Sequence, residues 1–270
     1  MPKTEPDTET ETGTGARIDA EALCAGYLED VTAHMRGILA ANGAALAAAA
    51  DRIAAQIADD RLLHVYGPGG HSNLAAQEVF FRAGGLMHVS AILDEGTLLS
   101  NGALRSMAME RTPGYGRVVI ADRGLGEGDL LLLVNAYGIN AALIDAAQEA
   151  RARGVALIGV SSRIHAESTA PDHPARHASG ANLHDLVDIH IDTAVPVGDA
   201  IVAVPGMDEQ IAAVSTFANA IALNALVIRV VARLMEQGIA PPVWRSGNAP
   251  GGDAANARFL ARFRDRVRAL

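Results

Sequence analysis

The chain has 270 residues, half of them hydrophobic and 4% aromatic, so its core must be built mainly from Ala, Val, Leu and Ile. The formal net charge of −9 argues against nucleic acid as the main partner, because phosphate contacts need clustered Lys and Arg. The single cysteine cannot form an internal disulfide, and charge or glycine interrupts the long apolar runs, so we expect a cytoplasmic protein that does not cross a membrane.

The N-terminal part predicts a tail followed by two helices. Residues 1–16 are rich in Thr, Glu, Gly and Pro, lack the apolar core of a signal peptide, and are expected to be disordered. Between Ile18 and Asp59, apolar residues recur at helical spacing, with a break at Asn42-Gly43. We therefore divide the chain into a tail (1–16), N-terminal helices that form an oligomer contact (17–60), a main domain (61–238) and a C-terminal loop and helix (239–270).

The stretch from Leu62 to Gly85 predicts a strand, a glycine-rich turn and a helix. Leu62–Tyr66 is a short apolar run typical of a buried central strand. Three glycines follow within residues 67–70, where glycine permits positive φ and close approach of a ligand to the backbone. Ser72 or Asn73 is expected to cap the next helix, whose free N–H groups favour an anionic ligand.

Strands and helices are expected to alternate along the rest of the chain. Buried strands are predicted at Leu86–Leu93, Leu130–Val134, Val155–Val160 and Leu186–Ile191. Helices are predicted at Leu98–Met109, Ala141–Arg153, Ser215–Leu234 and Ala254–Ala269, with a short apolar run at Val118–Ile120 and a long loop over Ile164–His184. This alternation implies an α/β fold of three layers, with a parallel sheet covered by helices on both faces.

Polar loops follow several of the predicted strands. In open parallel sheets, ligands bind beyond the carboxyl ends of the strands. That rule gathers four loops along one edge of the sheet, which makes this edge the expected ligand site. The four loops are Gly67–Ser72, Asp94–Gly96, Asn135–Asn140 and Ser161–His165.

The first turn is compatible with up to three kinds of ligand site. A nucleoside triphosphate loop requires Gly-Lys-Ser or Gly-Lys-Thr, and no such sequence follows Gly67. A dinucleotide fingerprint stays open, because Gly67-Pro68-Gly69 fits its start and Asp94 suits a ribose-binding acid, although Ser72 occupies the third glycine position. The third interpretation is a cradle of backbone amides and hydroxyls for a phosphorylated sugar.

Several longer motifs resemble those of the sugar isomerase (SIS) domain proteins. They are GGHSNLAAQEVFFRAGGL, ILDEG, MERTPGYG, PVGDA, PPVWRSGNAPGGD and the helix start after Tyr137-Gly138. The resemblance covers about Ile18 to Phe263 and is strongest to a bacterial subgroup whose first loop carries Gly-His-Ser. It implies a flavodoxin-like sheet of five parallel strands in a sugar-binding domain over residues 61–238. It also implies a sugar or sugar phosphate ligand, a homodimer or homotetramer, and no metal or other cofactor.

The turn after the middle strand departs from the family pattern. SIS proteins commonly carry Ser-x-Ser-Gly there, and its hydroxyls hold a phosphate. Here the positions are Asn135-Ala136-Tyr137-Gly138, so both serines are replaced. Asn135 can still donate a hydrogen bond, Gly138 and Asn140 keep the helix start, and Tyr137 can fill part of the pocket. A different anionic group or an unphosphorylated sugar therefore stays open.

The leading hypothesis is an isomerase that interconverts aldose and ketose sugars through an enediol. This reaction needs a carboxylate base, a ring-opening acid and donors for the developing oxyanion. Glu78, Glu95 and His71 are the predicted catalytic residues. Apolar neighbours of Glu78 favour a raised pKa, while its spacing from Arg82 favours a surface ion pair instead. Glu110 precedes Arg111 in the motif MERTPGYG, and an ion pair that anchors this loop is the alternative to a role as the base.

Two other functions remain open at this stage: a non-catalytic phosphosugar-binding or regulatory protein, and a lyase or etherase acting on an amino-sugar phosphate. The histidines of the long loop lack a neighbouring cysteine, so no metal site is predicted there, and His177 is assigned to a lid over the substrate. The predicted substrate-binding residues are Gly69, Gly70, Ser72, Asn135, Tyr137, Gly138, Asn140, Ser161, Ser162, His177 and Ser215.

Overall fold

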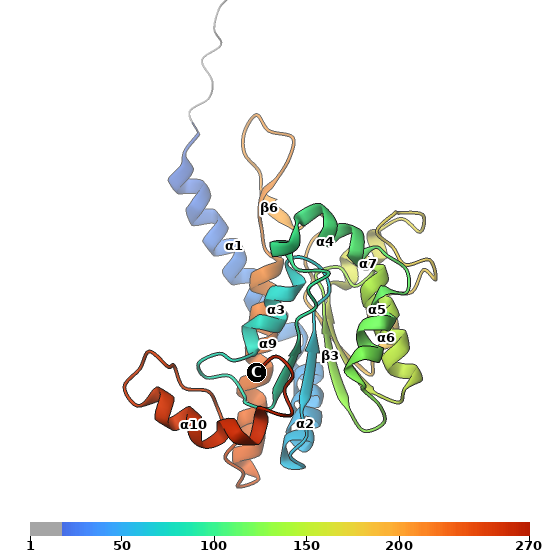
Figure 1. The fold of residues 1–270 in the computed structure, drawn as a ribbon. Coiled ribbons are helices and arrows are strands. Elements are labelled where there is room, and N and C mark those ends of the chain that lie inside the picture. The colour runs from blue at the N-terminus through green and yellow to red at the C-terminus, as the bar shows by residue number, and fades with distance from the viewer. Residues whose placement is uncertain (1–17) are drawn as a thin grey trace, which may run out of the picture.

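Five short strands form a parallel sheet at the centre of the computed structural model, which describes residues 18–270 (Figure 1). Their order is β2-β1-β3-β4-β5, the flavodoxin-like order that the resemblance implied, so the predicted fold is confirmed. Every residue of β2 and β3 is buried, as expected for parallel strands covered on both faces. The strands are β1 (Leu63–Tyr66), β2 (Val89–Ile92), β3 (Leu130–Val134), β4 (Ala156–Ser161) and β5 (Ile189–Asp192).

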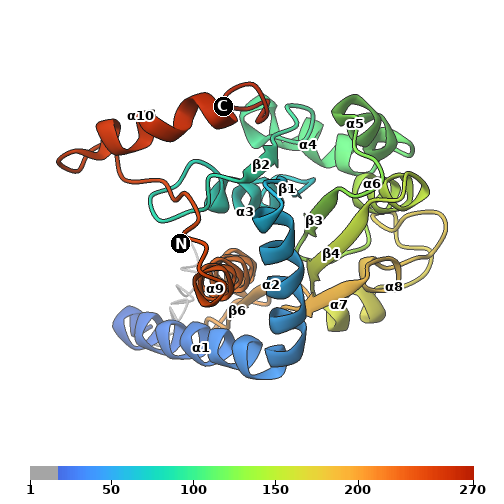
Figure 2. The same cartoon turned by 90° about the horizontal axis from the view of Figure 1, so that it is seen from below.

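Helices cover both faces of the sheet (Figure 2). Alternate strand residues contribute to the apolar clusters on the two faces. Val65 and Leu132 belong to one apolar cluster, shared with α1, α2, α3 and α9. Tyr66, Leu131 and Leu133 belong to a second cluster, shared with α5 and α6. The helices are α1 (Ala20–Ala41), α2 (Gly43–Ala58), α3 (Ser72–Val79), α5 (Tyr115–Arg123), α6 (Ala141–Ala152) and α9 (Ser215–Glu236).

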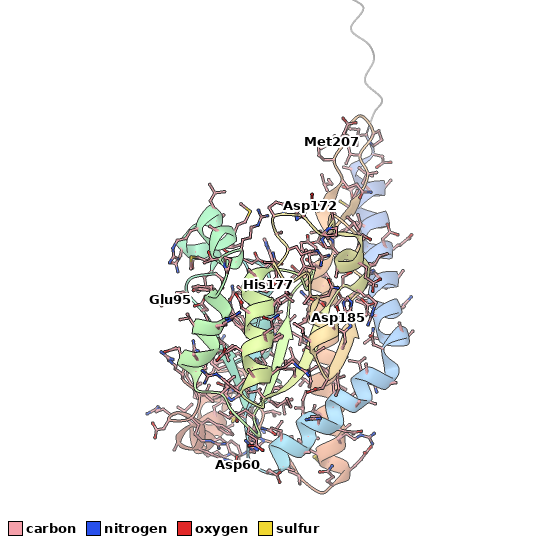
Figure 3. All side chains as sticks on the ribbon, turned by 90° about the vertical axis from the view of Figure 1, so that its right-hand side faces the viewer. Asp60, Glu95, Asp172, His177, Asp185 and Met207 are labelled. Carbon is pink, nitrogen blue, oxygen red and sulfur yellow. The ribbon has the colours of Figure 1, made fainter. Side chains whose placement is uncertain are left out.

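The carboxyl ends of the strands carry most of the remaining short elements. Figure 3 shows Asp172 and Met207 beyond this end and Asp60 at the opposite, amino end. A third apolar cluster, which includes Met87, Trp244 and Phe263, attaches the C-terminal helix near the amino end. The remaining elements are the 3-10 turn η1 (Leu99–Asn101), α4 (Ala103–Glu110), α7 (Arg163–Ser168), α8 (Leu183–Leu186), α10 (Gly252–Phe263), and the hairpin strands β6 (Ala200–Val202) and β7 (Ile211–Ala213).

Several predicted boundaries differ from the observed ones. The apolar run Val118–Ile120 lies inside helix α5, where two of its three residues are buried. The stretch Ile164–His184 is not one loop, because most of α7 lies within it and α8 begins there. The terminal helix begins two residues earlier than expected and ends at Phe263. The predicted tail, residues 1–16, lies outside the described residues.

Helix α9 corrects the expectation that no apolar run has membrane-spanning length. Within residues 18–270, α9 alone is long and apolar enough to qualify as a single helix, and the bent pair α1–α2 qualifies if counted as one span. In the fold, Ala222, Leu226 and Val230 of α9 are buried in the core against the sheet. This packing accounts for the apolar composition of the helix. The oligomer contact predicted for the N-terminal helices stays a prediction.

Candidate functional site

Asn135 joins the first two polar turns at the carboxyl end of the sheet. It follows β3 directly and is 2% exposed. Its Nδ2 donates to the carbonyl of Pro68 and to Oγ of Ser72, both at 3.1 Å. Its Oδ1 accepts the backbone N–H groups of Tyr137, at 3.0 Å, and Gly138, at 2.9 Å. The Asn135 side chain therefore connects the glycine turn to the turn after β3. The two turns are neighbours because β1 and β3 are adjacent parallel strands.

The Glu110 carboxyl lies directly over the glycine turn. Glu110 ends α4, and its Oε1 accepts a long hydrogen bond of 3.5 Å from Asn135. Gly69 has φ +108°, and a Cβ at this position would stand only 2.7 Å from Glu110 Oε1. Burial raises the pKa of Glu110 to about 7, against the lowering effects of the Asn135 hydrogen bond and the Arg111 charge. Within residues 18–270 no ion pair holds Glu110, so the loop-anchoring ion pair is not observed.

A cavity of about 520 Å³ opens beside Glu110. One wall is the phenol ring of Tyr137 stacked on the imidazole of His165, with ring centroids 3.7 Å apart and planes 15° from parallel. Two polar atoms of the wall, Oδ1 of Asn140 and Nδ1 of His165, are buried without a hydrogen-bond partner in the described part of the chain. Burial lowers the pKa of His165, so its imidazole is neutral near pH 7. The lining of the cavity thus combines the titratable carboxyl of Glu110, the stacked rings of Tyr137 and His165, and the polar side chain of Asn140.

A family model described as "SIS domain" matches residues 26–162, half of the chain. The chain belongs to the SIS domain family. The chain also has relatives of similar length: a UPF0309 protein of Caldanaerobacter subterraneus is 35% identical over 216 residues, covering 79% of this chain and 86% of that protein. A UPF0309 protein of Streptomyces griseus is 37% identical over 224 residues, covering 82% of this chain and 87% of its own.

Solved structures share the fold of this SIS protein at low sequence identity. The phosphoheptose isomerase of Neisseria gonorrhoeae superposes with a TM-score of 0.55 at 14% identity, covering 79% of this chain and 100% of that chain. The phosphoheptose isomerase of Francisella tularensis gives a TM-score of 0.51 at 15% identity, covering 79% and 98%. At these identities the likeness establishes the fold alone.

The structure corrects the predicted capping of α3, the helix that follows the glycine turn. The N-cap of α3 is His71, which makes no capping hydrogen bond with its side chain, and Ser72 is the first helical residue. Asn73 does not cap the helix either. Its Nδ2 donates to the carbonyl of Gly69 at 2.9 Å and to that of Thr97 at 3.0 Å. Both polar side chains, Ser72 and Asn73, therefore bond to residues outside their helix, which the local sequence pattern does not reveal.

Two of the predicted catalytic residues, His71 and Glu78, line a different cavity of about 290 Å³ beside α3 and α9. Glu78 Oε1 accepts a hydrogen bond from Asn224 at 3.0 Å and pairs with Arg82 Nε at 3.1 Å. The latter is the ion pair that the sequence spacing offered as the alternative to catalysis. Neither His71 nor Glu78 lines the cavity beside Glu110.

Glu95, the third predicted catalytic residue, lines yet another cavity, of about 410 Å³, with Arg123 and Arg268. Its neighbour Asp94 accepts a hydrogen bond of 2.7 Å from the hydroxyl of Tyr115. The structure therefore distributes the three predicted catalytic residues over two cavities, neither of which contains Glu110. Sequence reasoning did not select Glu110 as a catalytic residue because its burial depends on α4 folding back over the glycine turn. The available signal was its place in the motif MERTPGYG.

The turn after β4 is held by its own serines. Ser161 Oγ lies 3.0 Å from Nε2 of His190, and a Cβ on Gly138, which has φ +74°, would stand 2.7 Å from the same Oγ. Ser162 caps α7 by accepting the backbone N–H of His165 at 3.2 Å. Both serines are fully buried, so their observed contacts are with the protein.

Ser215 and His177 both interact with carboxylates of the chain, and their predicted contact with a ligand stays a prediction. Ser215 is the first residue of α9 rather than its cap, which is Val214, and its Oγ donates to Asp199 at 2.6 Å. His177 Nε2 lies 3.4 Å from the buried carboxylate of Asp145.

Over residues 18–270, no group of three or more His, Cys, Asp and Glu side chains is arranged to hold a metal ion.

Proposed function

We propose that this SIS protein is an isomerase that interconverts the aldose and ketose forms of a sugar or sugar derivative bound in the 520 Å³ cavity. The observation that carries the proposal is the partly buried carboxyl of Glu110, which lines this cavity and has a pKa raised to about 7. A general base or acid works best when its pKa lies near the working pH. Membership in the SIS family, and a fold shared with two phosphoheptose isomerases, support a sugar-type ligand.

Glu110 is proposed to move the proton between adjacent sugar carbons. As a carboxylate it removes the proton from the carbon next to the carbonyl, which leaves an enediolate. A proton then passes from the neighbouring hydroxyl to the former carbonyl oxygen. As a carboxylic acid Glu110 returns its proton to the former carbonyl carbon while the new carbonyl forms on the neighbouring carbon. A pKa near 7 lets one group perform both steps at neutral pH. The hydrogen bond from Asn135 Nδ2 keeps Oε1 in place over the turn.

The aromatic wall is proposed to orient the substrate. The stacked rings of Tyr137 and His165 present a flat surface to the C–H face of a sugar. The neutral imidazole of His165 can exchange hydrogen bonds with sugar hydroxyls, because its Nδ1 has no partner in the described chain. We further infer a cytoplasmic location and self-association through α1 and α9, which leave Leu28 and Ile228 exposed.

Exchange of sugar protons with solvent tests this proposal. The protein is incubated in D₂O with a panel of aldoses and ketoses and their phosphate esters, and deuterium at the carbon next to the carbonyl is followed by NMR. We expect incorporation with the wild type, loss of incorporation with Glu110→Gln, and wild-type behaviour with the matched control Glu78→Gln. A wild type that binds a sugar but never exchanges its proton would identify a non-catalytic binding protein instead.

A further inference from the structure

We infer that the ligand of the cavity beside Glu110 is an unphosphorylated sugar or polyol, recognised through its hydroxyl groups. This inference rests on the proposed sugar site and concerns the chemical class of its ligand. Three features carry it: the donors of the second turn are already engaged, a carboxyl of the chain occupies the glycine turn, and the cavity lining offers both an acceptor carboxylate and a side-chain amide.

The first feature is the state of the second turn. The backbone N–H groups of Tyr137 and Gly138 point to the Oδ1 of Asn135, at 3.0 and 2.9 Å. The Nδ2 of the same side chain is engaged by Pro68 and Ser72. The side-chain oxygen of Asn135 thus takes the place of an anion, because it already accepts the backbone N–H groups that an anion would need.

The second feature is the position of Glu110. Its carboxyl lies against Gly69, so a phosphate approaching the glycine turn would meet a group that is negatively charged above about pH 7. The phosphate and the Glu110 carboxylate would then compete for the same hydrogen-bond donors at the glycine turn. Like charges in such surroundings repel strongly because solvent screens them little. A hydroxyl meets no such repulsion and can donate to the carboxylate.

The third feature is the mixture of acceptors and donors in the cavity lining, which includes Glu110 and Asn140. The Glu110 carboxylate only accepts, whereas the side-chain amide of Asn140 carries an acceptor, Oδ1, that has no partner in the described chain and a donor, Nδ2. Sugar hydroxyls donate and accept, whereas a phosphate dianion only accepts. Hydroxyl groups can therefore pair with both side chains, and a phosphate dianion cannot pair with the carboxylate.

Positive charge near the cavity is sparse. The only lysine of the chain is Lys3, outside the described residues. Arg111 lines the cavity but is exposed. Arg176 follows the cavity residue Ala175 in sequence. Its two terminal guanidinium nitrogens donate to Asn182 Oδ1 at 2.8 Å and to the carbonyl of Thr169 at 3.0 Å, and only its Nε lacks a partner in the described chain. A site built for a phosphate usually places buried cations or free N–H groups around it.

The test compares matched pairs: glucose, fructose, mannose and ribose against their terminal phosphate esters, with inorganic phosphate alone as a further probe. Binding is measured at pH 8 by calorimetry and by the shift in melting temperature. We expect the wild type to bind at least one free sugar about ten-fold or more tightly than its ester, since 1.4 kcal/mol is a factor of ten. Asn140→Ala should weaken the free sugar by about ten-fold, the effect of one hydrogen bond.

Glu110→Gln should narrow the gap between sugar and ester, because it removes the negative charge, whereas the control Glu95→Gln should leave the gap unchanged. Circular dichroism shows whether each variant is folded. Esters that bind the wild type as tightly as the free sugars, or inorganic phosphate that competes with them, would overturn the inference while leaving a sugar site in place. If neither series binds, the proposed function itself fails, and the ligand class fails with it.

Discussion

The carboxyl of Glu110 occupies the space beside Gly69 that a side chain at position 69 would need. The two residues are far apart in the sequence, and a Cβ on Gly69 would lie 2.7 Å from Oε1. The glycine turn is therefore shaped to receive a carboxyl from its own chain. This contact links the fold to the proposed chemistry, because it buries the group whose pKa lies near 7.

Replacement of Gly69 by alanine is expected to lower the free energy of unfolding by roughly 2–4 kcal/mol, since it adds a collision to the strain of positive φ. Gly84→Ala is the matched control. Gly84 has φ +83° but open space where its Cβ would stand, so only the strain of roughly 1–2 kcal/mol applies. Urea unfolding measures both variants. Equal losses would mean that Glu110 moves aside without cost.

Glu110 should make the protein less stable as the pH rises from about 4.5 to 7. Its pKa is raised in the folded state, so between these values the native protein holds a proton that the unfolded chain has released. Its stabilising effect is complete below pH 4.5 and is lost as the pH passes 7. A shift from 4.5 to about 7 corresponds to about 3 kcal/mol. The difference in unfolding free energy between wild type and Glu110→Gln should fall over this range, and a constant difference would refute the buried state of Glu110.

Asn135→Ala should lower the free energy of unfolding by roughly 2–4 kcal/mol, because it leaves buried backbone donors without acceptors. The amide protons of Tyr137 and Gly138, now protected by Oδ1, should exchange faster with solvent. Asn224→Ala serves as the control, since Asn224 contacts Glu78 in a partly buried position and should cost less than about 1 kcal/mol. Unchanged exchange at the two amides would contradict the role of Asn135.

His88 lies at the amino end of the sheet. In contrast to Glu110, it should make the protein more stable as the pH rises from about 4 to 6.5. Burial lowers its pKa to about 4, against the raising effect of the hydrogen bond to Asp60. The unfolded chain then takes up a proton at a higher pH than the native protein does. The stabilising effect of His88 is complete above pH 6.5 and is lost as the pH falls towards 4. The difference between wild type and His88→Phe, followed by thermal unfolding, should therefore rise with pH over this range. A flat difference would show that the imidazole is accessible to protons.

The sheet and its ligand edge follow from the sequence because their causes are local. The run Leu130–Val134 contains only apolar residues, and such runs favour buried parallel strands whatever surrounds them. The spacing of Glu78 and Arg82 likewise predicts the ion pair that forms. The turns after β1 and β3 meet because adjacent parallel strands end at the same edge.

The partners of the site residues could not be predicted in the same way. Ser72 and Asn73 are good capping residues, but contacts with Asn135 and Thr97 replace capping. Glu110 ends a short helix, and nothing in its immediate sequence shows that the helix folds over Gly69. Burial and pKa depend on such long-range packing, which a pattern of neighbours does not contain.

The pH dependence of proton exchange by the wild-type protein tests the central claim most directly. With the sugar well below saturation in D₂O, the rate of deuterium incorporation next to the carbonyl reports the pKa of the base in the free protein. This rate should rise about tenfold per pH unit in acid and level off near that pKa. If Glu110 is the base, this break lies at about pH 7 and Glu110→Gln shows no exchange. A break in the ordinary carboxyl range, or exchange by Glu110→Gln at the wild-type rate, would contradict it.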